Sequence, residues 1–296
     1  MQVVLFTKFL EGMSIEQMGE TVKDLGYDGF DLAVRSRHAV NPDNIADALP
    51  TAMTHWNRLG LRCPMITLGT EANDPDAPET IHVFEAAGAA GIPLIKIGYF
   101  PFPPEADYWS LIDEARARLK GFIRLAARTG VKAVYHTHSG SVLGSNCAGL
   151  THLLRDFDPE HLGAYVDMGH MAVEGEDVQM GLSMVRGHLC VIGAKDARFV
   201  RVNDADEPAP WGKHFVYLGQ GAAAWKPALR LLHSWKFKGP FTVHTEYTLD
   251  REIMRAVGGV DSSSAALEMR ERGRVADLQF LRDSWAEVVA DATSAN

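Results

Sequence analysis

VVLFTKFLEGMSIEQMGETVKDLGYDGFDLAV, residues 3–34, holds two short apolar runs separated by an amphipathic stretch. Ser14 and Gln17 have the spacing of a capping box, in which each side chain bonds the other's backbone at a helix start. Gly26 stands where the helix ends, just before the second run. The stretch therefore predicts a strand, a helix and a second strand. Four apolar residues share one face of this helix: Ile15, Met18, Val22 and Leu25.

The same order of strand, helix and glycine recurs along the chain. An open, doubly wound sheet contains the same local units, but no GxGxxG phosphate turn follows the first apolar run. Eight repeats without that turn favour closure into a barrel. We therefore predict an α/β fold, a single (β/α)8 TIM barrel over residues 1–296. The eight strands are predicted at 3–9, 28–34, 61–68, 93–99, 131–138, 162–169, 188–195 and 239–247.

Two segments lie outside these repeating units. The longest gap between predicted strands contains RVNDADEPAPWGKHF, which is rich in Asp and Pro, and we expect a rim loop at about 197–216. After the last predicted strand, AALEMRERGRVADLQFLRDSWAEVV predicts a closing helix at about 265–290.

The composition limits the class of protein and its partners. Hydrophobic residues make up 46% and charged residues 23%, which is typical of a globular domain. The net charge of −9, without a cluster of Lys and Arg, argues against nucleic acid as a partner. We expect no membrane partner, because no apolar stretch approaches the roughly 20 residues that span a bilayer. Three cysteines without CxxC spacing and a start without a signal-peptide pattern predict a cytoplasmic protein. A homodimer and a tetramer both stay open.

Polar side chains close two neighbouring strands in the middle of the chain. Active groups of barrel enzymes stand at the C-terminal ends of the strands. The strand at 131–138 ends in YHTH, and His136 and His138 point to one side because strand side chains alternate. Asp167 closes the strand at 162–169, and His170 follows it three residues later.

The last two predicted strands end in polar residues as well. The strand at 188–195 ends in Lys195, and the final strand carries His244 and Glu246 on one face. Burying an acidic residue at the end of an apolar strand is costly without a cation. His and carboxylate side chains on neighbouring strands suit Mn²⁺, Mg²⁺, Co²⁺ or Zn²⁺. We therefore predict a divalent metal ion bound by Asp167, Glu246, His138 and His244.

Further polar residues are expected to meet the substrate. Arg198 would bind a hydroxyl, carboxylate or phosphate, and Arg35 and His38, just past the second strand, would contact the far end. Trp211 stands on the expected rim loop, where it is free to cover a substrate. Lys96 is either a proton donor or a cation that neutralises the acidic mouth. The predicted substrate-binding residues are Arg198, His170, Arg35, His38, Lys195 and Trp211.

The ordered set VYHTHSG, YVDMGHM, IGAKDAR and GPFTVHTEY resembles the xylose isomerase-like superfamily, in the branch of sugar phosphate isomerases/epimerases and AP endonuclease family 2. The resemblance covers nearly the whole chain and implies the barrel fold. It also implies a divalent metal held by a Glu on strand five, an Asp on strand six, a His on strand seven and a Glu on strand eight. Asp167 and His170 match the family's DxxH motif, and Glu246 matches the final-strand Glu.

Two positions depart from the family's pattern. His136 or His138 replaces the strand-five Glu, in a YHTH run similar to the YHHH run of inosose dehydratase-like members. The strand-seven His is Gly193. Either the metal has recruited other histidines, namely His138, His170 or His244, or the site has weakened. One of the two carboxylates of a two-Glu epimerisation is missing.

These observations predict a metal-dependent sugar or sugar phosphate isomerase or epimerase that acts on a small carbohydrate or cyclitol. The enzyme would move a proton next to a carbonyl through an enediolate, with Glu246 or His136 as base and a histidine such as His138 returning the proton. Lys96 is a further catalytic candidate. Two alternatives stay open: an inosose dehydratase-like lyase, and a catalytically degenerate sugar-binding barrel. Abasic-site cleavage needs zinc ligands on strands two to four and a basic groove, which this sequence does not provide.

Overall fold

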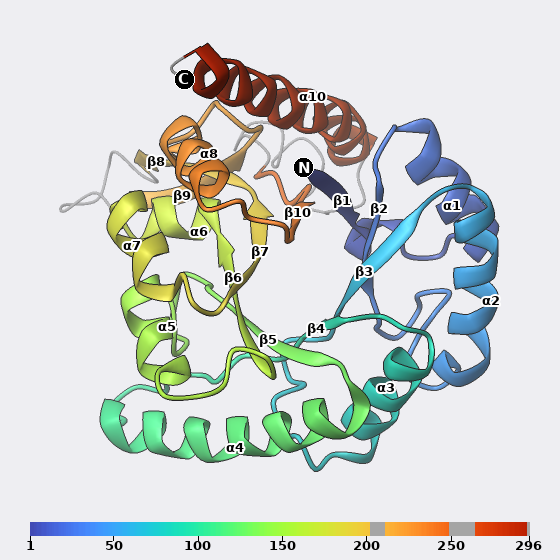
Figure 1. Cartoon of the computed structure of the whole chain (residues 1–296), viewed down its shortest axis with the longest axis vertical. Coiled ribbons are helices and arrows are strands. Elements are labelled where there is room, and N and C mark those ends of the chain that lie inside the picture. Colours follow the sequence, from blue (N-terminus) through green and yellow to red (C-terminus); the bar gives the residue numbers. More distant parts are fainter. Residues whose placement is uncertain (202–210, 249–263, 295–296) are drawn as a thin grey trace.

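Eight parallel strands close into a barrel in a computed structural model of the chain, which describes residues 1–201, 211–248 and 264–294 (Figure 1). Each strand is bonded to its neighbours in the order β1-β10-β7-β6-β5-β4-β3-β2. The predicted (β/α)8 barrel is thus confirmed, and each predicted strand contains or overlaps an observed one. The barrel strands are β1 (Gln2–Phe6), β2 (Gly29–Ala33), β3 (Arg62–Thr67), β4 (Leu94–Lys96), β5 (Lys132–His136), β6 (Leu162–Asp167), β7 (Leu189–Ala194) and β10 (Pro240–Val243).

Helices surround the barrel and cover the apolar outer face of the sheet (Figure 1). The first of them begins as its sequence predicts. The Ser14 Oγ accepts a hydrogen bond from the backbone N–H of Gln17, and the Gln17 side chain accepts one from the N–H of Ser14. The helical elements are η1 (Thr7–Leu10), α1 (Ile15–Asp24), α2 (Ile45–Arg58), α3 (Pro78–Ala89), α4 (Tyr108–Thr129), α5 (Cys147–Leu154), α6 (Met168–Val173), α7 (Val178–Val185), α8 (Trp225–Ser234) and α10 (Ser264–Ser294).

A small apolar cluster is separate from the main core between sheet and helices. Its fully buried members come from β3, β5, β6 and β7: Met65, Val134, Tyr165 and Val191. Side chains two residues apart on a strand point to the same face. His136 therefore shares a face with Val134, and Asp167 shares one with Tyr165. This cluster forms a floor under the polar strand ends.

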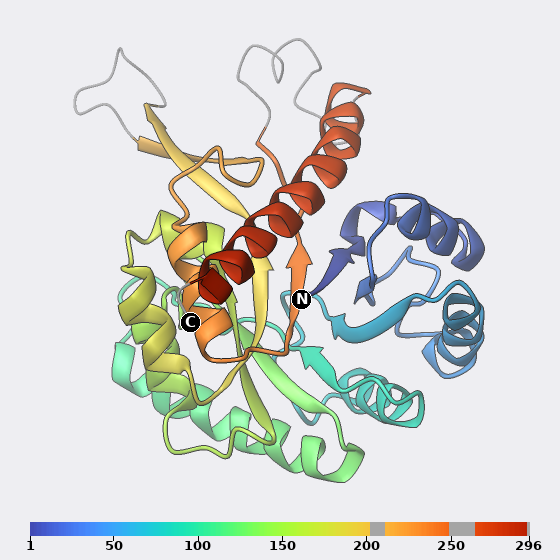
Figure 2. The same cartoon turned by 45° about the horizontal axis from the view of Figure 1, so that its top comes forward.

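The segment expected as a rim loop carries a two-stranded antiparallel hairpin. Its strands are β8 (Asp196–Arg201) and β9 (Trp211–Val216), and Asp196 pairs with Val216 at the base. The hairpin projects beyond the barrel (Figure 2). Asp196 fixes its base, because this fully buried carboxylate accepts backbone hydrogen bonds at 2.8–3.2 Å from the N–H groups of Ala197, Gly219, Gly221 and Ala223.

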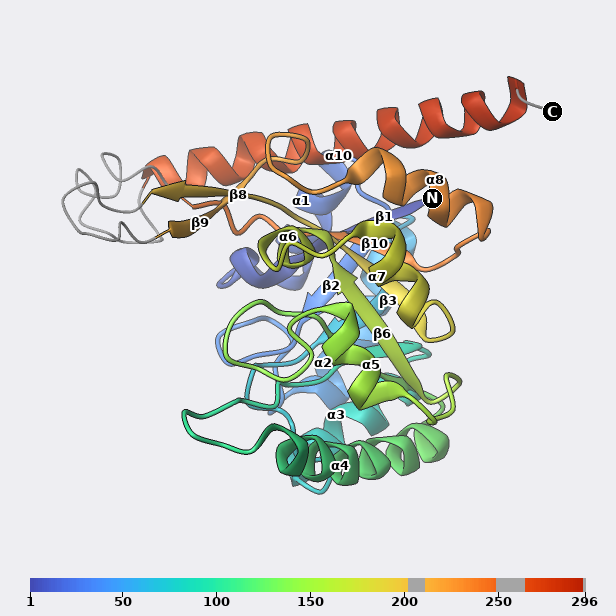
Figure 3. The same ribbon diagram turned by 90° about the vertical axis from the view of Figure 1, so that its left-hand side faces the viewer.

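The helix α10 runs across one side of the molecule and packs beside α8 (Figure 3). Buried hydrogen bonds tie it to the barrel. Tyr27, just before β2, donates to the carbonyl of Arg274 at 2.6 Å, and Tyr247, just after β10, donates to Asp277 at 2.7 Å. Among the described helices none combines the length and the apolar character that crossing a bilayer requires.

Candidate active site

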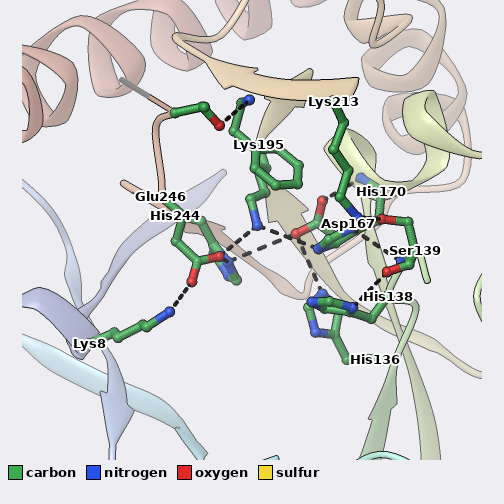
Figure 4. Close-up of polar contacts among 12 residues, drawn as sticks. Lys8, His136, His138, Ser139, Asp167, His170, Lys195, Lys213, His244 and Glu246 are labelled. Atoms are coloured by element: carbon green, nitrogen blue, oxygen red, sulfur yellow. Dashed lines mark hydrogen bonds and ion pairs between the residues drawn. The ribbon is translucent and has the colours of Figure 1, made fainter. Parts of the chain in front are cut away.

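The polar strand ends surround a cavity of about 100 Å³ at the C-terminal mouth of the barrel. One water needs roughly 10–15 Å³ of such space, so the cavity has room for several waters or for part of a polyhydroxylated molecule. Figure 4 shows the side chains at one end of it. The cavity is lined by Phe6, Lys8, Arg35, Thr67, Thr70, Lys96, Tyr99, His136, His138, Tyr165, His244 and Glu246.

Asp167 lies at the centre of the polar cluster and is fully buried (Figure 4). As N-cap of α6 it accepts a hydrogen bond on Oδ1 from the backbone N–H of His170, at 3.0 Å. Its Oδ2 faces His136 Nε2 at 3.4 Å and His244 Nδ1 at 3.9 Å. Burial raises the pKa of Asp167, but the surrounding histidines and Lys195 outweigh burial and hold the pKa below its usual value. The carboxylate is therefore ionised at neutral pH.

A tyrosine hydroxyl holds the other ring nitrogen of each of these two histidines. Tyr99 contacts His136 Nδ1 at 2.6 Å, and Tyr165 contacts His244 Nε2 at 2.5 Å. The remaining nitrogens, His136 Nε2 and His244 Nδ1, are buried and lack a hydrogen-bond partner within the described residues, as does Asp167 Oδ2. Burial lowers the pKa of His136 to about 3, so its imidazole is neutral. Three buried polar atoms without a hydrogen-bond partner in the described residues thus lie close together, and each could supply a lone pair to a metal ion.

Two lysines hold the carboxylate of Glu246. Lys195 donates to Glu246 Oε2 at 2.6 Å, and Lys8 bonds Oε1 (Figure 4). His244 Nδ1 lies 3.7 Å from the same Oε2. Burial raises the pKa of Glu246, but Lys195 and the other cations outweigh burial and hold the pKa well below its usual value. The Lys195 ammonium is itself buried and lies 4.0 Å from the centre of the Phe215 ring on the hairpin.

A second polar array joins strand β5 to the hairpin. The rings of His138 and His170 lie against each other, with centres 4.1 Å apart. His138 Nδ1 donates to the Ser139 carbonyl at 3.0 Å, which leaves Nε2 as the free acceptor of a neutral ring. Burial, and next Lys195, lower the pKa of His138 to about 4. The Ser139 hydroxyl bonds His170 Nδ1 at 2.8 Å and accepts from Lys213 on β9 at 2.8 Å. Both strand-five histidines line the cavity, and of the two it is His136 that faces Asp167, whereas His138 packs against His170.

Gly193 explains why strand seven adds no ligand. It pairs with Asp167 across β6 and β7, and a Cβ there would lie 2.9 Å from the Cα and Cβ of Asp167. Such a contact is far inside van der Waals distance, so a histidine would displace the Asp167 backbone. Within the ranges that the structure describes, no three His, Cys, Asp or Glu side chains are grouped so as to enclose a metal ion.

The remaining predicted residues separate into two groups. Lys96 is only 2% exposed and lines the cavity with Arg35. His38, in the segment between β2 and α2, is buried and lies outside the cavity lining. Arg198 lines a different cavity of about 220 Å³ beside the hairpin, and Trp211, which is 66% exposed, stands at the outer end of β9. The structure thus places the last three away from the Asp167 cluster.

Sequence reasoning missed four residues that shape the site. Lys8 lies near the end of the first predicted strand, at 3–9. The rule that polar residues at the C-terminal ends of strands form the site, which selected Lys195, would also have found Lys8. Tyr99 and Tyr165 were read as apolar members of their strands, since nothing in the pattern shows a hydroxyl aimed at a histidine. Asp31 is fully buried inside the barrel, where it accepts hydrogen bonds from Thr67 at 2.6 Å and from Thr242 at 2.8 Å.

A closed parallel barrel with a His, carboxylate and Lys cluster at its strand ends defines the class of the protein. The chain belongs to the xylose isomerase-like TIM barrel family, whose sequence pattern it matches over residues 20–283. No curated protein matches it in sequence.

Solved structures share the fold at low sequence identity. A D-tagatose 3-epimerase-like protein is 15% identical with a TM-score of 0.72, and the match covers 99% of this chain and 100% of that one. An L-ribulose 3-epimerase is 13% identical with a TM-score of 0.70, and the match covers 100% of this chain and 98% of that one. A xylose isomerase-like TIM barrel protein from Mycobacterium smegmatis, solved in complex with magnesium, is 13% identical with a TM-score of 0.64, covering 96% of this chain and 97% of that one.

Proposed function

We propose that the protein is an isomerase or epimerase of a sugar or cyclitol, and that it moves a proton at the carbon next to a carbonyl. The observation that carries the proposal is the convergence of three buried, unpartnered atoms, Asp167 Oδ2, His136 Nε2 and His244 Nδ1, beside Glu246. Buried polar atoms without partners are rare in folded proteins, and such atoms mark a place for a ligand or ion. The epimerase descriptions of the structural neighbours support the same reaction class.

The donor set fits a divalent metal ion in its chemistry, although the described side chains are not grouped closely enough to enclose one. Asp167, Glu246, His136 and His244 would hold it, because carboxylate oxygens and neutral imidazole nitrogens are the ligands that Mn²⁺, Co²⁺ and Zn²⁺ accept. Each imidazole already has its second nitrogen bonded to a tyrosine, which is how proteins orient metal-binding histidines. The magnesium complex of a protein with the same fold supports a divalent ion as the cofactor. When bound, the ion would polarise the carbonyl and hydroxyl oxygens of the substrate.

The protein's own groups would carry the proton. Glu246 lines the cavity and would be the base that removes the proton from the carbon. Lys195, buried and bonded to Glu246, holds this carboxylate in place and keeps a positive charge next to the enediolate. His138 Nε2 is an acceptor, because its Nδ1 donates to the Ser139 carbonyl, so it would first take a proton from a substrate hydroxyl and then pass that proton to the carbon. Glu246 would give the proton that it removed to the former carbonyl oxygen. The cavity walls, Tyr99 and Tyr165 among them, would limit access of water.

The test measures metal binding and turnover in the same preparation. We expect calorimetry to show one bound Mn²⁺ per wild-type chain and none for Asp167→Ala, since a buried strand-end carboxylate is the ligand least easily replaced by water. Incubation of the Mn²⁺-loaded protein with a panel of ketoses and inososes should produce a new isomer of at least one of them by NMR. Equal metal content in Asp167→Ala and wild type would refute the ligand assignment.

The product identifies the branch of the reaction. An isomer or epimer retains all atoms of the substrate, whereas a dehydratase releases a water and gives a product two hydrogens and one oxygen lighter. A product of that mass would replace the isomerase with the lyase. Binding of sugars without any change in the whole panel would contradict both and indicate a barrel that only binds.

A further inference from the structure

Two cations in the cavity wall form no direct ion pair with a carboxylate among the described residues, although Asp31, Glu71 and Glu246 act on Lys96 from a greater distance. Lys96, at the end of β4, is 2% exposed, and the contact of its ammonium is the face of the Tyr99 ring, at 3.8 Å. Arg35 follows β2 and donates a hydrogen bond to the carbonyl of Leu68 at 3.4 Å, while its buried Nε has no partner among the residues that the structure describes. Neither residue forms an ion pair with a carboxylate in the described ranges.

The charge balance of the lining is therefore positive. Its basic residues are Lys8, Arg35 and Lys96, and its acidic residue is Glu246, which Lys8 and Lys195 already neutralise. Burial, and next the positive charge of Arg35, lower the pKa of Lys96 to about 7. A buried cation without a counter-charge is costly, and an anion placed beside it removes that cost.

We propose that the substrate is an acidic sugar, whose carboxylate or phosphate group is bound by Arg35 and Lys96 while its carbonyl end lies against Glu246 and Asp167. This inference rests on the proposed function and specifies its substrate class. A guanidinium presents a planar fork of N–H donors, and here Nε is the free donor of that fork. Thr67 and Thr70, on the same wall, supply hydroxyl groups for the sugar between the two ends.

The larger neighbouring cavity constrains where the anion lies. This cavity of about 500 Å³ shares Arg35 and Thr70 with the smaller one. Its other charged residues are all acidic: Asp43, Glu71, Asp74 and Glu79. These carboxylates repel an anion, so the acidic group of the substrate is held on the inner side of Arg35, and the outer cavity accepts uncharged hydroxyl groups.

The experiment compares matched acidic and neutral sugars by equilibrium binding, which does not require turnover. Isothermal titration calorimetry of the full chain would use D-galactose against D-galacturonate, and D-fructose against D-fructose 6-phosphate, with inorganic phosphate as a further probe. We expect at least one acidic sugar to bind wild type at least about tenfold more tightly than its neutral counterpart. A gain for the galacturonate pair alone assigns a carboxylate, and a gain for the fructose pair alone assigns a phosphate.

The variants are Arg35→Met and Lys96→Met, with Arg37→Met as the matched control. Arg37 lies two residues from Arg35 but points to solvent and pairs with Glu11 at 2.7 Å. Each test variant should weaken binding of the acidic sugar at least about tenfold more than binding of its neutral counterpart, whereas the control keeps both affinities. If Lys96→Met does not fold by circular dichroism, Arg35→Met and the conservative Arg35→Gln decide alone.

Equal affinity of wild type for both members of every pair would overturn the inference. An equal loss of acidic and neutral binding in Arg35→Met would also overturn it. A different result would refute the proposed function. Selective binding of an acidic sugar without any turnover or hydrogen exchange would support the anion site and contradict the isomerase activity. Turnover of neutral sugars without a preference for acidic sugars would support the isomerase activity and contradict the anion site.

Discussion

Hydroxyl groups of two tyrosines decide which histidine nitrogens face Asp167. Tyr99 and Tyr165 each bond the nitrogen that points away from the carboxylate, at 2.6 and 2.5 Å. A neutral imidazole carries one proton, so a nitrogen that donates to the tyrosine oxygen leaves a lone pair on the other nitrogen. The two pairs thus orient His136 and His244 as the proposed metal site requires.

Removing these hydroxyls should weaken metal binding without unfolding the protein. We expect Tyr99→Phe and Tyr165→Phe each to lower Mn²⁺ affinity by about 10- to 100-fold, the usual effect of losing such an orienting partner. Tyr108→Phe is the matched control, because Tyr108, at the start of α4, bonds His152 at 2.9 Å in an exposed pair outside the cavity lining. Calorimetric titration measures all three, and unchanged affinity in both site variants would show that the tyrosines only pack.

The strand-end rule predicted much of the site from sequence, for a physical reason. His136 and Asp167 end apolar strands and Glu246 follows the end of β10, and parallel strands of a barrel present those ends at one mouth. The rule does not say which of two histidines in YHTH faces the acid, because His136 and His138 share a face. It also cannot find Tyr99, whose role depends on a contact with the neighbouring strand.

At the scale of the element, the hairpin of β8 and β9 is the part of the rim that departs most from expectation. The sequence predicts a loop here because Asp and Pro are frequent at residues 202–210, which lie outside the described residues. The flanking strands place Trp211 at the outer end and Lys213 over Ser139 at the site. Arg198 consequently belongs to the hairpin's own cavity.

Asp196 should be a major determinant of stability in this element. Its carboxylate satisfies four backbone N–H groups in a buried position, and each buried donor left unpaired costs about 1–3 kcal/mol. We expect Asp196→Ala to lower the free energy of unfolding by at least ~3 kcal/mol in urea titrations. Asp177→Ala, which removes an exposed helix cap with one N–H partner, should cost only about 1 kcal/mol. Similar losses in the two variants would contradict this role.

At the scale of the whole molecule, Asp277 joins α10 to the barrel rim. It is 1% exposed and accepts hydrogen bonds from Tyr247 after β10 and from the N–H of Leu218 after β9. Burial raises the pKa of Asp277 to about 7. An unfolded chain gives an Asp a pKa of about 3.9, so the folded state holds an extra proton between about pH 4 and 7.

The stability of the protein should therefore depend on pH through this residue. Because the folded state binds more protons, the contribution of Asp277 to the free energy of unfolding falls as pH rises from about 4 to about 7 and then levels off. Asp277→Asn should flatten this slope. As pH rises from about 4 to about 7, the free energy of unfolding of the variant should therefore gain up to about 4 kcal/mol relative to that of wild type. Urea unfolding at about pH 5 and about pH 8 measures the difference, and parallel pH profiles would refute the assignment.

The architecture as a whole followed from repetition in the sequence. Eight strand, helix and glycine units predict a closed barrel because each strand is buried on both faces and each helix covers one. The separate hairpin breaks that period, and periodicity gives no rule for such an insertion.

The central claim is proton transfer next to a carbonyl with Glu246 as base, and hydrogen exchange with solvent measures it most directly. Wild type and Glu246→Gln would be incubated in D₂O at saturating Mn²⁺ with a panel of neutral and acidic ketoses and with inososes. We predict that wild type incorporates deuterium at the carbon next to the carbonyl of at least one substrate. In Glu246→Gln, which keeps the shape but loses the proton affinity, exchange should fall by at least ~10²-fold without rescue by excess metal. Wild-type exchange rates in Glu246→Gln, or no exchange by wild type with any member of the panel, would contradict the claim.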